Sequence, residues 1–279
     1  MGLCNSKTRE GKSPFSLNFN GLNSKNINSQ NSHDPNKFCF EDGRRFHNVK
    51  GAVYFLPNDE DECERLHLQH FIERYVWQSN FFAPVDHLLN QEGTKVLDVG
   101  TGAGSWLLEM ASNYPKAKFI GMDISPVQPD LIKPKNDLLK QIWPTVVNEL
   151  VRVLKPGGYI ELAESDFQYS IMGPATTRII NGILIMFDER GLDPTVCYKI
   201  RGFLEEHEQL HEVHCEIKKK LDGKDDAKLC KLSYENYTTA LMTMKPKLMS
   251  VIGASNDEYD ELVKNMGNEL IEFESFNSR

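Results

Sequence analysis

The chain has 279 residues, a formal net charge of −8 and a calculated isoelectric point near 5.6. An acidic balance does not favour a nucleic-acid-binding surface, so we expect no nucleic-acid partner. The sequence contains no apolar run of roughly 18 residues that could form a transmembrane helix. Its six cysteines lack C-x-x-C spacing and no apolar signal-peptide core precedes them. Reduced thiols and a cytoplasmic location are therefore expected.

Residues 1–45 are rich in Asn, Ser and Lys and poor in aliphatic residues, which predicts a disordered tail. The first six residues match M-G-x-x-x-[ST], the acceptor pattern for N-myristoylation at Gly2. A single myristoyl chain anchors weakly, and Cys4 offers a second site for an acyl chain. The sequence leaves two alternatives open. The tail is either acylated and holds the protein peripherally at a membrane surface, or it is unmodified.

Residues 46–92 form a predicted N-terminal helical segment. A helix is expected after Pro57, because Asp59 to Glu62 place acidic side chains in its first turn, where the helix dipole favours them. Apolar residues at helical spacing predict one buried stripe on this helix. The stripe consists of Leu68, Phe71, Ile72, Tyr75 and Val76.

Residues 93–279 form the predicted main domain, which begins with an apolar strand over 95–99 and a glycine-spaced turn. From Asp98 to Gly104 the pattern is D-x-G-x-G-x-G, which differs from the dinucleotide fingerprint G-x-G-x-x-G because Ser105 occupies the third glycine position. Residues without side chains at Gly100 and Gly102 let a ligand approach the backbone closely. The alternative is a βα turn with only a packing role.

A second short strand over 118–122 is followed by another acid, Asp123. This residue lies 25 positions after Asp98, close to the spacing of about 20 residues at which a carboxylate meets a ribose diol in related sheets. An ionised carboxylate can accept both hydrogen bonds of such a diol. The strand and its acid therefore strengthen the prediction of a nucleoside site, although a solvated strand-end Asp is the alternative.

The rest of the chain is predicted to be mainly helical. Pro144 begins a helix that runs to Leu154, and a strand follows over 159–164. We expect a helical insertion over about 174–211 and a strand over 212–221. A capping box from Ser255 to Glu258 then starts a last helix. Its apolar stripe consists of Tyr259, Leu262, Val263, Met266, Leu270 and Phe273.

Four segments together carry a family resemblance: "DECERLHLQHFIERYVWQSNFFAPV", "KVLDVGTGAGSW", "FIGMDISPVQP" and "ELVRVLKPGGYIELAES". They resemble fungal class I S-adenosylmethionine-dependent methyltransferases of the velvet-complex, secondary-metabolism-regulator type, over roughly residues 40–275. The resemblance implies an α/β fold, a Rossmann-like three-layer sandwich around a seven-stranded sheet, with S-adenosyl-L-methionine as cofactor. It implies that Asp123 holds the ribose and that Ile124 lies beside the adenine. It assigns the methionine end of the cofactor to Asp98, Gly100, Thr101, Gly102 and Gly104.

The chain also departs from this family. Only 36 positions separate Asp123 from Tyr159, and one strand–helix–strand unit needs about 30 residues. The two further strands that the family has in this interval do not fit, and the family's last strand is missing as well. We therefore expect a reduced sheet. The strand over 95–99 then either keeps an open edge or pairs with the strand over 159–164.

Two functions follow as hypotheses. The first is a methyltransferase that acts on an unidentified small molecule or protein, and no catalytic base is predicted because methyl transfer depends mostly on proximity and alignment. The second is a non-catalytic, membrane-tethered binding or scaffold protein on a truncated methyltransferase fold. The acids Glu161, Glu164 and Asp166 are expected near the cofactor cleft. Histidine pairs at 67/70 and 207/211 lack further ligands, so no metal site is predicted.

Overall fold

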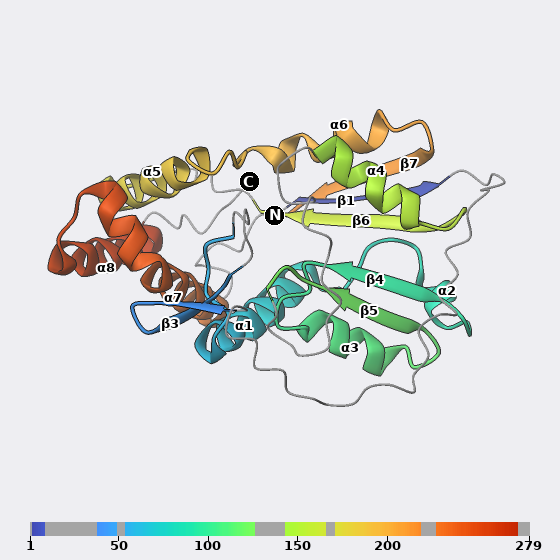
Figure 1. The fold of residues 1–279 in the computed structure, drawn as a ribbon, viewed down its shortest axis with the longest axis horizontal. Helices are drawn as coiled ribbons and strands as arrows, with labels where there is room; N and C mark the ends of the chain where they lie inside the picture. The colour runs from blue at the N-terminus through green and yellow to red at the C-terminus, as the bar shows by residue number, and fades with distance from the viewer. Residues whose placement is uncertain are drawn as a thin grey trace.

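The computed structural model describes residues 2–8, 38–48, 54–125, 143–165, 171–218 and 227–272. Its described strands form three separate sheets rather than one seven-stranded sheet. Two of these sheets and their helices lie on one side of the molecule, and a helical bundle lies on the other (Figure 1). The fold is thus α/β with a reduced sheet, as the sequence predicts.

The glycine turn belongs to a two-stranded parallel sheet made of β4 (Lys95–Val99) and β5 (Lys118–Met122). Helix α3 (Ser105–Asn113) is the crossover helix between the two strands, and the short helix α2 (Asp86–Leu89) precedes β4. Among the described strands only β5 pairs with β4. Of the two outcomes left open by the sequence, the β4 edge therefore stays unpaired within this part of the chain.

The second sheet contains the strand that begins at the second residue of the chain. Its order is β6–β1–β7, with β1 (Gly2–Thr8) antiparallel to both β6 (Tyr159–Glu164) and β7 (Leu210–Ile217). Helices α4 (Trp143–Val153) and α6 (Ile200–Glu205) cover this sheet, and the 3₁₀ helix η2 (Val196–Tyr198) precedes α6. Their shared core contains Val147, Val151, Ile160, Ile200, Leu204 and Leu210.

This sheet corrects the expected disorder of residues 1–45. Residues 2–8 are a strand, because the ladders on both sides pair backbone groups that an isolated tail would leave to water. A hairpin of β2 (Phe38–Glu41) and β3 (Arg44–His47) ends the tail, and Arg45 stacks over the Phe38 ring. The remainder of the predicted tail, residues 9–37, lies outside the described residues.

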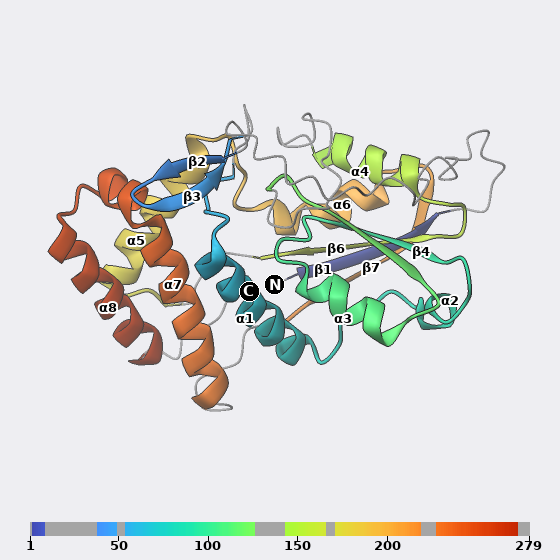
Figure 2. The same cartoon turned by 60° about the horizontal axis from the view of Figure 1, so that its bottom comes forward.

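Helix α1 (Glu60–Trp77) lies between the helical bundle and the glycine turn (Figure 2). Asp59 caps it by accepting the Glu62 N–H, so the predicted start is confirmed. The predicted apolar stripe is partly wrong, because Phe71 and Tyr75 are 56% and 49% exposed while Ile72 is buried. The helix instead buries an ion pair between Glu62 and Arg65, and it forms polar contacts with α3.

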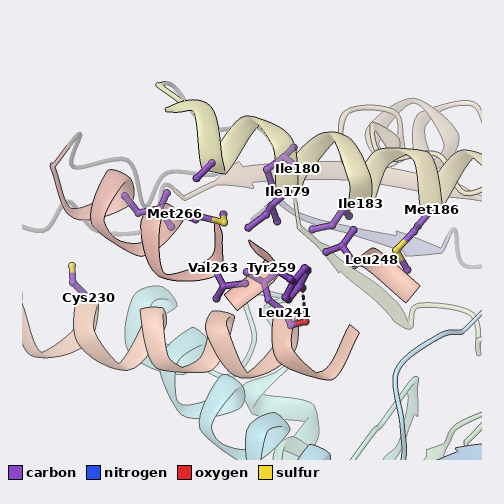
Figure 3. Packing of buried hydrophobic residues seen from close by; sticks show 12 residues of the cluster. Ile179, Ile180, Ile183, Met186, Cys230, Leu241, Leu248, Tyr259, Val263 and Met266 are labelled. Atoms are coloured by element: carbon purple, nitrogen blue, oxygen red, sulfur yellow. Dashed lines mark hydrogen bonds between the residues drawn. The ribbon is translucent and has the colours of Figure 1, made fainter. Parts of the chain in front are cut away.

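The helical bundle consists of α5 (Pro174–Asp188), α7 (Ala227–Ile252) and α8 (Asn256–Glu272). The last helix starts with the predicted capping box, in which Ser255 and Glu258 exchange backbone-to-side-chain hydrogen bonds. Tyr259 is fully buried and donates its hydroxyl to the Leu241 carbonyl at 2.8 Å (Figure 3). Most of the predicted α8 stripe is buried with it: Tyr259, Val263, Met266 and Leu270. Phe273 lies outside the described residues.

Candidate cofactor site

The glycine turn after β4 depends on the conformational freedom of its three glycines. Gly100, Gly102 and Gly104 have φ angles of +83°, +53° and +80°, in the left-handed region that favours glycine. The N–H groups of Gly100 and Thr101 both donate to the Met122 carbonyl, at 2.8 and 3.2 Å. The turn is therefore tied to the end of β5, where Asp123 follows.

Asp123 closes the turn with both of its carboxylate oxygens. Oδ2 accepts the Gly102 N–H at 2.8 Å, and Oδ1 accepts the Ser125 N–H at 2.8 Å. A carboxylate has about four acceptor positions, so two remain for a ligand hydroxyl pair. The sequence predicted that the glycine turn and this acid lie together, and the geometry agrees.

Asp98 lies at the same edge, because its register partner on β5 is Gly121, two residues before Asp123. Burial raises the pKa of the Asp98 carboxyl, the Thr101 hydroxyl opposes that rise, and the nearby Asp123 carboxylate adds to it. The Thr101 hydroxyl is close enough to act on this pKa but has no hydrogen bond of good geometry among the described residues. A buried hydroxyl with spare capacity thus lies beside the two acids.

The residues present at this edge leave room for S-adenosylmethionine. A Cβ added at Gly100 would meet no atom within 4 Å, so a ligand has room above this backbone position. At Gly102 the nearest atom to such a Cβ would be Leu66 Cδ1 of α1, at 3.5 Å. The edge therefore offers open backbone, spare acceptors and a buried hydroxyl, a donor and acceptor set that suits a sugar and an amino-acid group. Ile124 is half-buried beside it.

Helix α1 forms polar contacts with α3 that sequence reasoning did not predict. His67 Nδ1 contacts the Ser105 hydroxyl, and His70 Nε2 is 2.8 Å from Glu109 Oε2 on α3. Both histidines of the predicted pair therefore bind α3 residues. Among the described residues, no group of three or more His, Cys, Asp or Glu side chains could hold a metal ion.

A buried polar cluster below α1 also escaped the sequence analysis. Asn58 donates to the Ser125 hydroxyl at 2.9 Å, which ties the start of α1 to the loop after Asp123. Glu62 and Arg65 form an ion pair in which each side chain is at most 5% exposed. Burial raises the pKa of Tyr54, and the charges of Glu62 and Asp123 raise it further. The Glu–Arg pair at i, i+3 in the predicted helix was the available signal.

The predicted acids of β6 have separate roles. Glu161 Oε2 accepts the N–H groups of Phe82 and Ala83 at 2.9 and 2.7 Å, so it anchors the connection between α1 and α2. Burial raises the pKa of both Glu161 and Glu164. The arrows of β4, β5 and β6 point to the same side of the molecule in Figure 1, and Glu164 is the last residue of β6. Asp166 lies outside the described residues.

Comparison with known proteins identifies the segment that forms this site. Residues 90–128, which contain β4, the glycine turn, β5 and Asp123, match a family model described as a methyltransferase domain. The resemblance to fungal class I methyltransferases is confirmed. The domain match and the relatives below imply S-adenosyl-L-methionine as the methyl donor. No solved structure matches the chain.

Similar proteins include one from Emericella nidulans and one from Aspergillus terreus. Protein-methionine methyltransferase laeA of Emericella nidulans is 32% identical over 185 residues, which cover 56% of this chain and 48% of laeA. Methyltransferase pytC of Aspergillus terreus is 29% identical over 194 residues, covering 57% and 58% of the two chains. The chain matches about half the length of these relatives.

Two sites predicted from the sequence stay predictions. Gly2 is the first residue of β1, where its register partners are Glu164 and Ile217. Cys4 lies two residues further along the same strand, opposite Leu162 and Cys215. Neither position carries evidence of acylation. Within the described residues, no helix combines the length and the apolar composition needed to cross a bilayer.

Proposed function

We propose that the chain binds S-adenosylmethionine at the carboxyl edge of β4 and β5 and transfers its methyl group to an acceptor nucleophile. The observation that carries this proposal is the hydrogen bond from the Gly102 N–H to Asp123, at 2.8 Å. It joins the glycine turn, Asp98 and Asp123 into one edge, within the segment that matches a methyltransferase domain.

Each predicted residue has a role in this proposal. Gly100, Gly102 and Gly104 give the cofactor access to the backbone. Asp98 and the Thr101 hydroxyl face the amino-acid end. Asp123 uses its two remaining acceptor positions for the ribose hydroxyls, and Ile124 packs beside the adenine.

The chemistry needs no dedicated base at this edge. S-adenosylmethionine supplies an electrophilic methyl group on a sulfonium centre. When bound, it would supply that methyl group to the lone pair of an acceptor, and its sulfur would leave as a neutral thioether. What the chain contributes is alignment and exclusion of water, which can lower such a barrier by several kcal/mol. The acceptor is an unidentified protein or small molecule, and the E. nidulans relative is named for methionine residues of proteins.

Calorimetric titration of the full chain with S-adenosylmethionine tests this proposal. We expect a saturable heat and a rise in melting temperature. Asp98→Asn should lower the affinity for the cofactor at least tenfold and should reduce the rise in melting temperature. The matched control is Asp257→Asn, an exposed position on α8, which should bind as the unmodified chain does. Neither heat nor thermal shift at millimolar cofactor would overturn the proposal. Label transferred from the methyl-labelled cofactor to a fungal protein extract would extend it from binding to catalysis.

A second candidate function is a non-catalytic binding or scaffold protein, tethered to a membrane by its N-terminus. The exposed apolar side chains of β4 favour it, since Leu97 and Val99 are 43% and 50% exposed on a strand that a complete sheet would cover. A chain that unfolds cooperatively and fails to bind the cofactor would support this candidate. Intact-mass analysis of the protein from a eukaryotic host tests the tether, because acylation at Gly2 or Cys4 adds the mass of an acyl chain.

A further inference from the structure

The strand β1 occupies a position that otherwise would be an open slot in the second sheet. Since β6 and β7 each run antiparallel to β1, they run parallel to one another and cannot be joined by a short hairpin. Without β1, both would present a row of unpaired N–H and C=O groups. The β1 ladder extends from Gly2 to Lys7 on β6 and from Gly2 to Thr8 on β7. The first residues of the chain therefore complete a sheet built from residues 159–217.

The register of this strand places two cysteines directly opposite one another. Cys4 is the Cα partner of Cys215 on β7. Directly opposed residues of antiparallel strands have Cα atoms about 4.5 or 5.5 Å apart, and disulfides span Cα distances of about 4.4–6.8 Å. The backbone thus meets the distance requirement for a disulfide between positions that are 211 residues apart in the chain, 215 minus 4.

The residues next to this pair indicate that positions 4 and 215 lie on the face of the sheet that α4 and α6 cover. Leu162, the partner of Cys4 on the other side, packs against the core formed with α4 and α6, and so does Cys215. Cys215 is a half-buried thiol in the structure. A disulfide at this position would join β1 to β7 on the side of the sheet that α4 and α6 cover.

We propose that Cys4 and Cys215 form a reversible disulfide that fastens β1 between β6 and β7. Glutathione disulfide is a suitable oxidant: one cysteine thiolate attacks it to form a mixed disulfide and releases one glutathione thiol. The second cysteine thiolate then attacks the mixed disulfide and releases the other. The protein loses two protons and two electrons, and the oxidant is reduced to two thiols.

This latch has a direct consequence for the predicted lipid modification. A thioester at Cys4 and a disulfide at Cys4 require the same sulfur atom, so one excludes the other. In a reducing cytosol the two cysteines would be reduced for most of the time. Cysteine pairs in such a compartment act as redox sensors rather than as permanent cross-links. Oxidising conditions would hold the N-terminal strand in the sheet and withdraw Cys4 from acylation.

The test uses the full-length protein incubated with glutathione disulfide and digested without reduction. We expect a cross-linked pair of tryptic peptides, one ending at Lys7 and the other running from Gly202 to Lys218. Cys4→Ser and Cys215→Ser should each abolish it, and the matched control Cys197→Ser should leave it intact. The oxidised chain should melt about 5–10 °C higher than the reduced one. Glutathione adducts alone, or cross-links to other cysteines instead, would overturn the proposal.

A second pair of variants tests the strand separately from the latch. Leu3 is the partner of Glu216 in the adjacent row of the register. In a chain that also carries Cys4→Ser and Cys215→Ser, the double substitution Leu3→Cys with Glu216→Cys should cross-link under the same oxidant. If this engineered pair links while the natural pair does not, β1 is inserted but the disulfide is refuted. If neither pair links, the strand placement is refuted as well. Both results are independent of cofactor binding.

Discussion

Two acids of the candidate site, Asp123 and Asp98, should respond differently when each is replaced by its amide. We expect the first replacement to destabilise the fold and the second to leave it unchanged or to stabilise it. In Asp123→Asn, one of the two backbone N–H groups now held by the carboxylate at 2.8 Å would face an amide NH₂ group, a donor against a donor. A hydrogen bond to a charged group contributes about 1.5–3 kcal/mol, so we expect Asp123→Asn to lower the free energy of unfolding by about 2 kcal/mol.

Asp98→Asn removes a charge that burial disfavours. Because the folded-state pKa of Asp98 lies above its ordinary value, the ionised form opposes folding. The wild-type chain should lose stability as the pH rises from the ordinary Asp value, near 3.9, through the raised folded-state value. At neutral pH we expect Asp98→Asn to be neutral or stabilising by up to about 1 kcal/mol. Its stability should depend less on pH across that window.

Urea unfolding followed by far-UV circular dichroism, at pH 7 and at pH 4, measures both effects. The denaturant slope checks that the substitutions change stability and not the unfolded state. The reasoning is refuted if Asp98→Asn destabilises as much as Asp123→Asn at pH 7. It is equally refuted if Asp123→Asn has no effect, since the turn would then not depend on the carboxylate that joins it to β5.

Three further predictions concern a helix cap, a buried ion pair and the backbone at a glycine. Glu269→Gln should cost about 1 kcal/mol in urea unfolding at pH 7, since its carboxylate accepts the Ala175 and Thr176 N–H groups at the start of α5. These bonds lower the Glu269 pKa despite opposing desolvation, so the loss relative to wild type should shrink as pH falls through that lowered value, and an unchanged pH profile would contradict it. Arg65→Met should lower the free energy of unfolding by about 3–5 kcal/mol by leaving Glu62 buried without its partner, and Glu62→Gln combined with Arg65→Met should recover part of that loss in the same assay. Gly100→Ala has space for its methyl group but a φ of +83°, so a cost of about 1–2 kcal/mol should come from the backbone alone, and a stability equal to wild type would refute that strain.

The parts of the fold that sequence predicted well are those fixed by local chemistry. The start of α1 next to its acidic residues, the capping box at Ser255 and the glycine turn after β4 all depend on residues within a few positions of each other. The pairing of β4 with β5 was also predictable, because one crossover helix joins two short apolar strands. From that pairing the proximity of Asp98 and Asp123 follows.

What sequence did not predict depends on partners far along the chain. Residues 2–8 have the composition of a disordered tail, and only the two ladders from β6 and β7 make them a strand. The apolar spacing of α1 predicted burial of Phe71, but the helix turns the Glu62 and Arg65 face inward. Periodicity identifies a helix and its apolar face, but the neighbours decide which face is buried.

The β4–β5 sheet and the β6–β1–β7 sheet are connected by side-chain hydrogen bonds rather than by a backbone ladder. Glu161 on β6 holds the N–H groups of Phe82 and Ala83, and Lys218, after β7, donates to the Trp77 carbonyl at 3.2 Å.

From the other side, Trp106 on α3 donates to the Asn80 carbonyl at 2.7 Å. The connection between α1 and α2 thus links the sheet that carries the glycine turn with the sheet that β1 completes. Among the described strands β4 pairs only with β5, so these side-chain hydrogen bonds, and no strand ladder, connect the two sheets. Any change that frees β1 should therefore reach the cofactor edge through Glu161 and residues 77–83.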